Sequence, residues 1–123
     1  MPNDYKILGQ GVLSTTTGVN GNPITLDLYT VPAGKSAIIS TFSVKDTVGT
    51  GGKALNLAVR IGGATIGIEQ YVLAYRGGVN DSGSIPLGLT LSAGDVLSAI
   101  TISSAGTGFY NTFNMTVFGT EIS

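Results

Sequence analysis

The sequence predicts a small all-β domain, an antiparallel β-sandwich of about eight strands of jelly-roll type. Three observations favour this fold. Short runs rich in Val, Ile, Thr and Tyr alternate between apolar and polar residues, clusters of glycine and asparagine separate the runs, and no long segment has a clear helical period. Because 123 residues suffice for one core, residues 1–123 are expected to form a single domain.

The stretch 28–40 gives the clearest local signal for this fold, because two strand-like runs flank a well-specified turn there. Pro32 sets φ for the second position of a type I turn starting at Val31, and Gly34 can take the left-handed conformation that closes it. A similar stretch recurs at 89–100, where Ala-Gly-Asp stands in place of Ala-Gly-Lys. The sequence therefore predicts two hairpins of the same kind.

The first half of the chain is predicted to hold four strands after a short polar arm at residues 1–5. Glycines within the first strand indicate a bulge or the close approach of another backbone. Strict alternation places Leu28 and Tyr29 on opposite faces, and likewise Ile39 and Phe42. Since apolar residues then occupy both faces of the third strand, we expect it to be covered twice, by the core and by another element or subunit. The strands are expected at 6–15, 25–30, 37–45 and 54–61, a turn cluster at 16–23, a mobile loop at 46–53 and a tight hairpin turn at 62–63.

In the second half, the segment 65–75 is ambiguous. Its Thr, Ile, Val and Tyr content and an interrupting Gly67 favour a strand, whereas the spacing of its apolar residues also matches a helix, so a helical turn at 69–74 stays open. The last strand alternates cleanly, with Phe113, Met115 and Val117 on one face. The other strands are expected at 85–91, 96–103 and 112–121, and the glycine-rich loops at 76–84 and 104–108.

The charge content is low and evenly scattered. Six basic and seven acidic residues give a net charge of -1, and the charged fraction is 11 %, against about 25 % in a typical soluble domain. No basic stripe suggests a nucleic-acid partner, and no apolar window suggests a membrane span or a signal peptide. A monomer with so few charges would tend to associate, so we expect copies of the chain or another protein to cover part of the surface.

The chain contains no His and no Cys, which excludes Ser-His and Cys-His nucleophile pairs and thiolate or imidazole metal sites. Asp46, Asp81 and Asp95 lie in turn contexts, where Asp commonly accepts backbone hydrogen bonds. No catalytic residue, metal site or cofactor site is therefore expected, and the chain is not predicted to be an enzyme. The segment 109–111, Phe-Tyr-Asn, would suit either a sugar-binding platform or packing at the end of the sandwich or against a neighbouring subunit.

Two motifs, Tyr29-Thr-Val-Pro-Ala-Gly-Lys35 and Leu91-Ser-Ala-Gly-Asp95-Val-Leu, resemble small virion structural proteins of tailed bacteriophages. These are capsid decoration (cement) proteins and neck, tail or head-fibre modules. The segment 117–122 also looks like the closing strand of such modules, and the motifs follow in the right order. The resemblance implies a β-sandwich or jelly-roll fold, frequent assembly as trimers, and a stabilising role without catalytic residues. The chain departs from the family in having no extended N-terminal arm.

From this resemblance we expect a capsid decoration protein that binds across capsid subunits. It would reside in the virion, after synthesis in the host cytoplasm without a signal peptide. Its expected partners are itself, as a homotrimer, and the major capsid protein or another virion protein, with no nucleic acid and no membrane. The alternative is a tail or fibre module that binds a host-surface glycan. Because aromatic and Arg side chains often anchor interfaces, the candidate subunit or capsid contacts are Asp4, Tyr5, Ile39, Tyr71, Tyr75, Arg76, Phe109 and Tyr110.

Overall fold

The computed structural model describes residues 5–49, 54–63, 69–75 and 82–123. Within these residues the chain forms eight strands and one short 3-10 turn, η1 (Ile61–Gly63), which follows the fourth strand. The strands are β1 (Tyr5–Ser14), β2 (Pro23–Thr30), β3 (Ser36–Gly49), β4 (Leu55–Arg60), β5 (Glu69–Tyr75), β6 (Ser82–Ser92), β7 (Val96–Ile102) and β8 (Asn111–Ile122).

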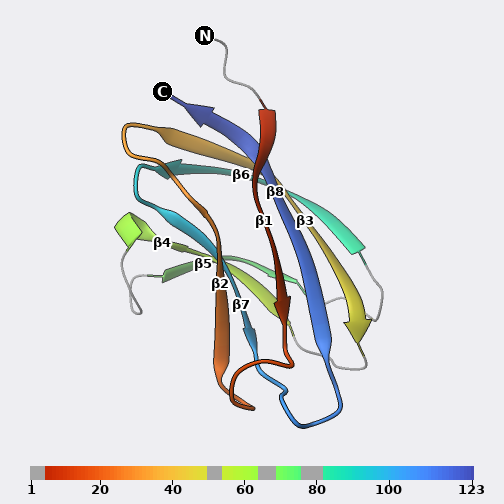
Figure 1. The fold of residues 1–123 in the computed structure, drawn as a ribbon. Helices are drawn as coiled ribbons and strands as arrows, with labels where there is room; N and C mark the ends of the chain where they lie inside the picture. Colours follow the sequence, from red (N-terminus) through yellow and green to blue (C-terminus); the bar gives the residue numbers. More distant parts are fainter. Residues whose placement is uncertain (1–4, 50–53, 64–68, 76–81) are drawn as a thin grey trace.

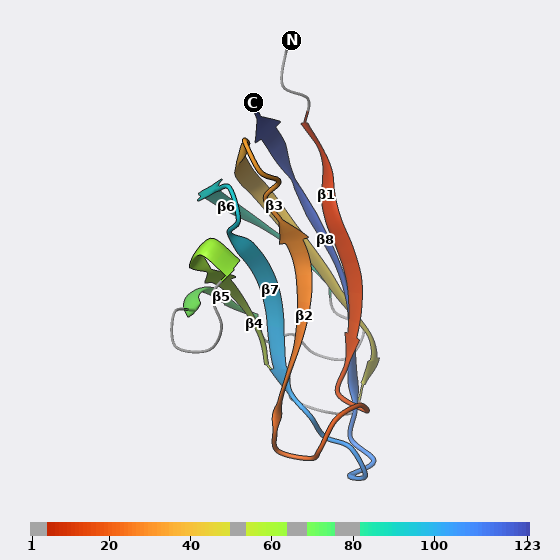
Figure 2. The same ribbon diagram turned by 60° about the vertical axis from the view of Figure 1, so that its left-hand side comes forward.

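The strands form two antiparallel sheets that face each other (Figures 1 and 2). Sheet A has the order β1-β8-β3-β6, and sheet B has the order β2-β7-β4-β5. The chain passes from one sheet to the other at every connection except that between β4 and β5. This wrapping is the strand order of a jelly roll, so the predicted fold class is confirmed.

The two predicted hairpins are wrong, although both turns form. Lys35 donates its N–H to the Pro32 carbonyl at 3.2 Å, and Gly34 has a φ of 77°. This turn therefore starts at Pro32, one residue later than expected, and it joins β2 of sheet B to β3 of sheet A. The turn at Asp95 likewise joins β6 of sheet A to β7 of sheet B. A turn motif specifies a local chain reversal, and the apolar faces on both sides of it decide which sheet each strand joins.

The two turns lie against each other at one end of the sandwich. Val31 donates its N–H to the Asp95 carbonyl at 3.0 Å and accepts the Gly94 N–H at 3.0 Å. The Asp95 carboxylate in turn accepts the N–H groups of Ser92, at 2.9 Å, and of Gly62, at 2.8 Å. The expected role of Asp95 as a backbone acceptor is confirmed, and through it the two turns and η1 form one connected unit.

Bulges in β2 and β3 overturn the expected alternation. The pairing register shifts between Asp27 and Tyr29, so both Leu28 and Tyr29 are buried. A second shift next to Ile39 brings Ile39 and Phe42 to the same side, and both are fully buried. The apolar residues that suggested two covered faces of β3 therefore all lie in the core, on the side of sheet B, while Ile38 is 37 % exposed on the outside. Coverage of this outer face by another subunit stays a prediction.

The core lies between the sheets. Its largest fully buried side chains include Phe42, Phe113, Ile39, Leu55, Leu57 and Leu97, and the expected core face of β8 is confirmed. The strand assignment of β5 is confirmed and its helical alternative is wrong. β3 extends to Gly49, into the expected loop, and β4 and β5 are joined by the segment 61–68 rather than by a tight turn at 62–63.

Glycines in β1 allow the edge of sheet A to approach sheet B closely. A Cβ atom at Gly9 would overlap the carbonyl oxygen of Leu28, and one at Gly11 would meet the side chain of Leu26 at 2.5 Å. The register of β1 also shifts between Ile7 and Gly9. Both expectations for these glycines, a bulge and a close approach, are confirmed.

Candidate binding surfaces

The outer face of sheet A carries an exposed apolar area near the start of β1, here called the arm-end patch (Tyr5, Ile7, Ile38 and Phe118). Tyr5 is 59 %, Ile7 51 % and Ile38 37 % exposed. The ring of Tyr5 stacks on that of Phe118, with centroids 6.1 Å apart and planes 7° apart. Tyr5 and Ile38 both pair with Thr120 in β8, from opposite sides, so the patch extends over three neighbouring strands.

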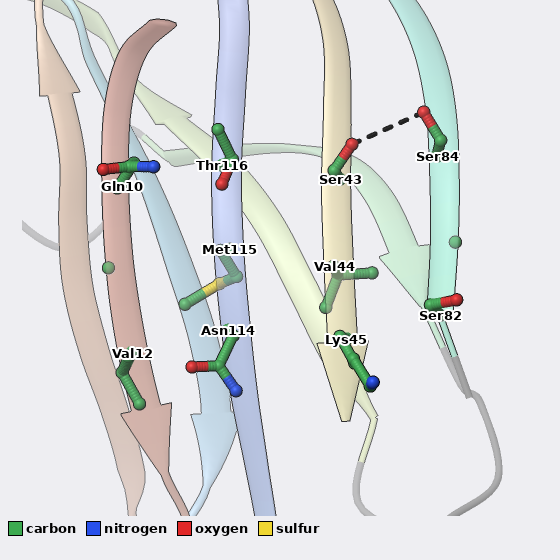
Figure 3. A pocket seen from close by; sticks show the side chains of 12 residues that line it. Gln10, Val12, Ser43, Val44, Lys45, Ser82, Ser84, Asn114, Met115 and Thr116 are labelled. Carbon is green, nitrogen blue, oxygen red and sulfur yellow. Dashed lines mark hydrogen bonds between the residues drawn. The ribbon is translucent and has the colours of Figure 1, made fainter. Parts of the chain in front are cut away.

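Farther along the same face, short polar side chains line a hollow of about 740 Å³, here called the sheet groove (Figure 3). Four strands contribute to it, and the registers arrange the side chains in two rows. Lys45 is the one charged residue among those that line it. The first row is Gln10, Thr116, Ser43 and Ser84, and the second is Val12, Asn114, Lys45 and Ser82.

Two loops lie at the opposite end of β1 (Figure 1), and each exposes one large apolar side chain. These side chains, here called the loop-end patch, are Val19, 66 % exposed, and Phe109, 61 % exposed. The loops that carry them, 15–22 and 103–110, contain no charged residue. Both large apolar side chains therefore project from an uncharged surface.

Hydrogen bonds tie these two loops together. Ser103 donates its N–H to the Asn22 carbonyl at 2.9 Å and accepts the Gly21 N–H through its own carbonyl at 2.9 Å. Deeper in, the buried Thr15 hydroxyl is bonded to the Ser104 hydroxyl at 2.6 Å and accepts the Asn111 N–H at 2.9 Å. The two loops that carry the loop-end patch are therefore joined to each other by hydrogen bonds.

Asp46 and Asn111 belong to the same buried hydrogen-bond network as Thr15 and Ser104. Both are fully buried, and the Asn111 side-chain amide donates to the Asp46 carboxylate, which also accepts the Thr112 N–H at 3.4 Å. Asp46 lies on β3 rather than in a loop, but its expected role as a backbone acceptor is confirmed. Because Asn111 is buried, it cannot join Phe109 and Tyr110 in an exposed sugar platform.

Glu121 is the centre of a cluster of charged and polar side chains near the arm-end patch. It accepts hydrogen bonds from Lys6 at 2.9 Å and from the Tyr29 hydroxyl at 2.7 Å, and Lys35 lies 3.6 Å away. The hydrogen bond from Lys6, followed by that from Tyr29, holds the pKa of Glu121 below its ordinary value. Burial, and then Glu121 itself, raises the pKa of Tyr29. The cluster joins β8 to β1, β2 and the first turn.

The carboxylates with described side chains all make structural bonds. Asp27 forms a two-pronged ion pair with Arg60, with both N–O distances 2.8 Å, while Asp46, Asp95 and Glu121 bind as described above. Within the described part of the chain, no cluster of three or more His, Cys, Asp or Glu residues is suited to a metal ion. The same residues include no helix long and apolar enough to cross a membrane.

The candidate contact residues differ in their exposure to solvent. Tyr5 and Phe109 are exposed at opposite ends, and Tyr110 is half-buried beside Phe109. Ile39 is fully buried in the core, so its assignment to an interface is corrected: the bulge in β3 turns it inward and leaves Ile38 outside. Tyr71 and Tyr75 lie opposite Ala58 and Leu55 along the backbone of β5, while their side chains, and the whole of Asp4 and Arg76, are outside the described residues.

Sequence reasoning missed Ile7, Ile38, Val12 and Val19, which are exposed, and the sheet groove as a whole. The residue types of Ile7, Val12 and Ile38 gave no signal, because isolated Ile and Val residues in strands are usually assigned to a core. Val19 lies in the expected turn cluster at 16–23, which was not considered as a contact surface. The groove residues carry no motif either, since they come from four strands that only the jelly-roll order brings side by side.

Neither a protein-family model nor a curated protein matches the chain. Among solved structures it is similar to a chain of infectious bursal disease virus Gt strain, with 11 % identity and a TM-score of 0.49 over 98 % of this chain and 32 % of that one. A chain of the Gx strain of the same virus gives 11 % identity and a TM-score of 0.38, over 95 % of this chain and 32 % of that one. The Drosophila NLP core, whose structure concerns pentamer formation and histone binding, gives 10 % identity and a TM-score of 0.39, over 94 % and 99 %.

The chain thus spans 32 % of each of the two virus chains. With identities of 10–11 % and TM-scores below 0.5, these likenesses assign no function, partner or assembly to it.

Proposed function

We propose that the chain is a virion structural protein of a tailed bacteriophage, a capsid decoration protein that binds across the joints between shell subunits. The observation that carries this proposal is the pair of exposed apolar patches at opposite ends of a sandwich whose sequence is only 11 % charged. Exposed apolar areas of this kind commonly mark protein-binding surfaces. The resemblance of the 29–35 and 91–97 motifs to phage decoration and fibre modules supports the class of partner.

In this proposal the two patches have different partners. The loop-end patch joins copies of the chain in a homotrimer, and the arm-end patch, with Asp4 before it, contacts the shell. Because hydrogen bonds join the two loops, they lose little conformational freedom on binding, which favours Phe109 as an anchor between copies. Tyr71, Tyr75, Arg76 and Tyr110 are proposed to extend the contact between copies. The role is one of binding alone, without catalysis, cofactor, nucleic acid or membrane, and its place is the virion.

The test uses particles of the encoding phage assembled without this chain. Purified protein added to them should sediment with the shells and raise the temperature at which they release DNA. Tyr5→Ser should weaken shell binding at least tenfold, as the loss of an aromatic anchor does. Thr25→Ala, an exposed change on the outer face of sheet B, is the matched control and should bind normally. Protein that stays in the supernatant, or that binds only tails, would contradict the decoration role.

The alternative function is that of a tail or fibre module that binds a host-surface glycan, and the structure favours a different site for this glycan from the one expected. Buried Asn111 weakens the platform expected at Phe109 and Tyr110. The sheet groove has the polar lining that such a module would need. Binding of a glycan by the isolated protein, with no binding to shells, would favour this alternative.

A further inference from the structure

The sheet groove has a regular chemical layout that the decoration role does not use. Each row crosses four strands, and neighbouring strands in a sheet are about 4.8 Å apart. The first row presents an amide and three hydroxyl groups in succession, from Gln10 through Thr116 and Ser43 to Ser84. Figure 3 shows these side chains on one face, with the Ser43 hydroxyl donating to that of Ser84 at 3.4 Å. The groove therefore offers a ladder of groups that both donate and accept hydrogen bonds.

Three of the side chains in the groove are held in place more firmly than long surface side chains would be. Ser43, Asn114 and Thr116 are half-buried in the two central strands of sheet A, β3 and β8. Ser and Thr have few rotamers to lose, so binding a ligand through them costs little side-chain entropy. The volume of about 740 Å³ lies within the range of small-molecule sites, roughly 300–1,000 Å³.

The charge of the groove restricts the ligand further. Lys45 is exposed in the second row, and within the described residues it makes no salt bridge. One cation is too few for a nucleic-acid backbone, which needs several. A peptide that binds through apolar side chains would make few contacts here, because Val12 is the one exposed apolar side chain in the two rows. Many hydroxyls together with one negative group would satisfy both the ladder and Lys45.

We propose that the sheet groove is a binding site for a carboxylated saccharide. The Gln10–Thr116–Ser43–Ser84 row bonds to the sugar hydroxyls, and Lys45 pairs with the carboxylate. This inference deepens the alternative function, since it names the class of glycan that the sheet groove binds. It stands apart from the decoration role, because it concerns the isolated chain and requires no shell.

The test measures binding by calorimetry with two probes, oligogalacturonate and its neutral methyl ester. Wild-type protein should bind oligogalacturonate with a Kd of about 1 mM or lower, and the ester about tenfold more weakly. Lys45→Met should lower the affinity for oligogalacturonate about tenfold and leave that for the ester unchanged. Thr116→Val, which keeps the branched shape and removes the hydroxyl, should weaken binding of both probes. Lys35→Met removes a cation outside the groove and should change neither affinity.

Amide chemical shifts then locate the probe on the wild-type protein. Shifts confined to 10–12, 43–45, 82–84 and 114–116 are expected. No binding of either probe at about 5 mM, or shifts centred on 103–110, would overturn the proposal. Equal binding of the two probes by wild type and by Lys45→Met would overturn the assignment of Lys45 to a carboxylate. Because no shell is present, these failures differ from a failure of the decoration role.

Discussion

Asp95 binds the backbone of Gly62: its Oδ1 accepts the Gly62 N–H at 2.8 Å, joining the second turn to η1. Its Oδ2 accepts the Ser92 N–H of its own turn at 2.9 Å, and the residue is only 9 % exposed. One carboxylate therefore fixes the relative position of two connections from different parts of the chain.

Replacing Asp95 should show what these two bonds contribute. Asp95→Ala leaves both N–H groups without their acceptor and should lower the free energy of unfolding by about 2 kcal/mol. Asp95→Asn keeps one acceptor oxygen and should cost about half as much. Urea unfolding followed by tyrosine fluorescence measures both changes. Equal losses for the two variants would contradict the assignment of a separate N–H to each oxygen.

Gly9 is required for space rather than for an unusual backbone angle. Gly9→Ala would drive a Cβ atom into the Leu28 carbonyl oxygen, so we expect a loss of several kcal/mol or no folded protein. Gly21→Ala is the control, because nothing lies within 4 Å of its Cβ position and only its φ of +86° opposes the change. It should cost about 1 kcal/mol. A folded Gly9→Ala protein as stable as Gly21→Ala would show that the two sheets are not in close contact at this point.

The Glu121 cluster predicts how stability depends on pH. Since the folded pKa of Glu121 is lowered from 4.5, its stabilisation is present above pH 4.5 and is lost as the pH falls through the folded value. Since the pKa of Tyr29 is raised from 10.0, its contribution is lost as the pH rises above 10.0. Urea midpoints measured from about pH 6 to about pH 3 should fall less steeply for Glu121→Gln than for wild type. Parallel curves would contradict a stabilising role for this carboxylate.

The exposed and buried aromatic residues should behave oppositely. Phe109→Ser removes a side chain that is 61 % exposed, so stability should change by less than about 0.5 kcal/mol while association weakens. Phe42→Ala removes a fully buried ring and should cost about 3–5 kcal/mol. Thermal unfolding and sedimentation measure the two properties separately. Unchanged association of Phe109→Ser would remove the loop-end patch from the contact between copies.

The positions of the strands could be predicted from the sequence, because each strand carries its own local signal. The alternation of Phe113, Met115 and Val117 in β8 is an example. The partner of each strand could not, since the turns at Pro32 and Ser92 look the same whether the chain returns to its own sheet or crosses to the other. Strand pairing depends on burial over the whole domain, which no local motif records.

The faces of the strands and the surfaces were harder to predict for a related reason. A bulge shifts every later side chain to the other face, and the β3 segment next to Ile39 contains no glycine or proline. Pro86 and Gly88, whose φ is 60°, lie at this shift on the partner strand β6, where the sequence alone does not link them to Ile39. Tyr5 and Phe109 could be selected by residue type, and both are exposed. The sheet groove could not, because Gln10, Ser43, Ser84 and Thr116 become neighbours only through the order of sheet A.

The solution mass of the purified protein, measured by light scattering from about 1 µM to about 1 mM, tests most directly the claim that this chain works by association. The account predicts a mass of three times 12.5 kDa that persists on dilution and is lost in Phe109→Ser. A mass of 12.5 kDa at every concentration would contradict the claim that copies of the chain cover the loop-end patch.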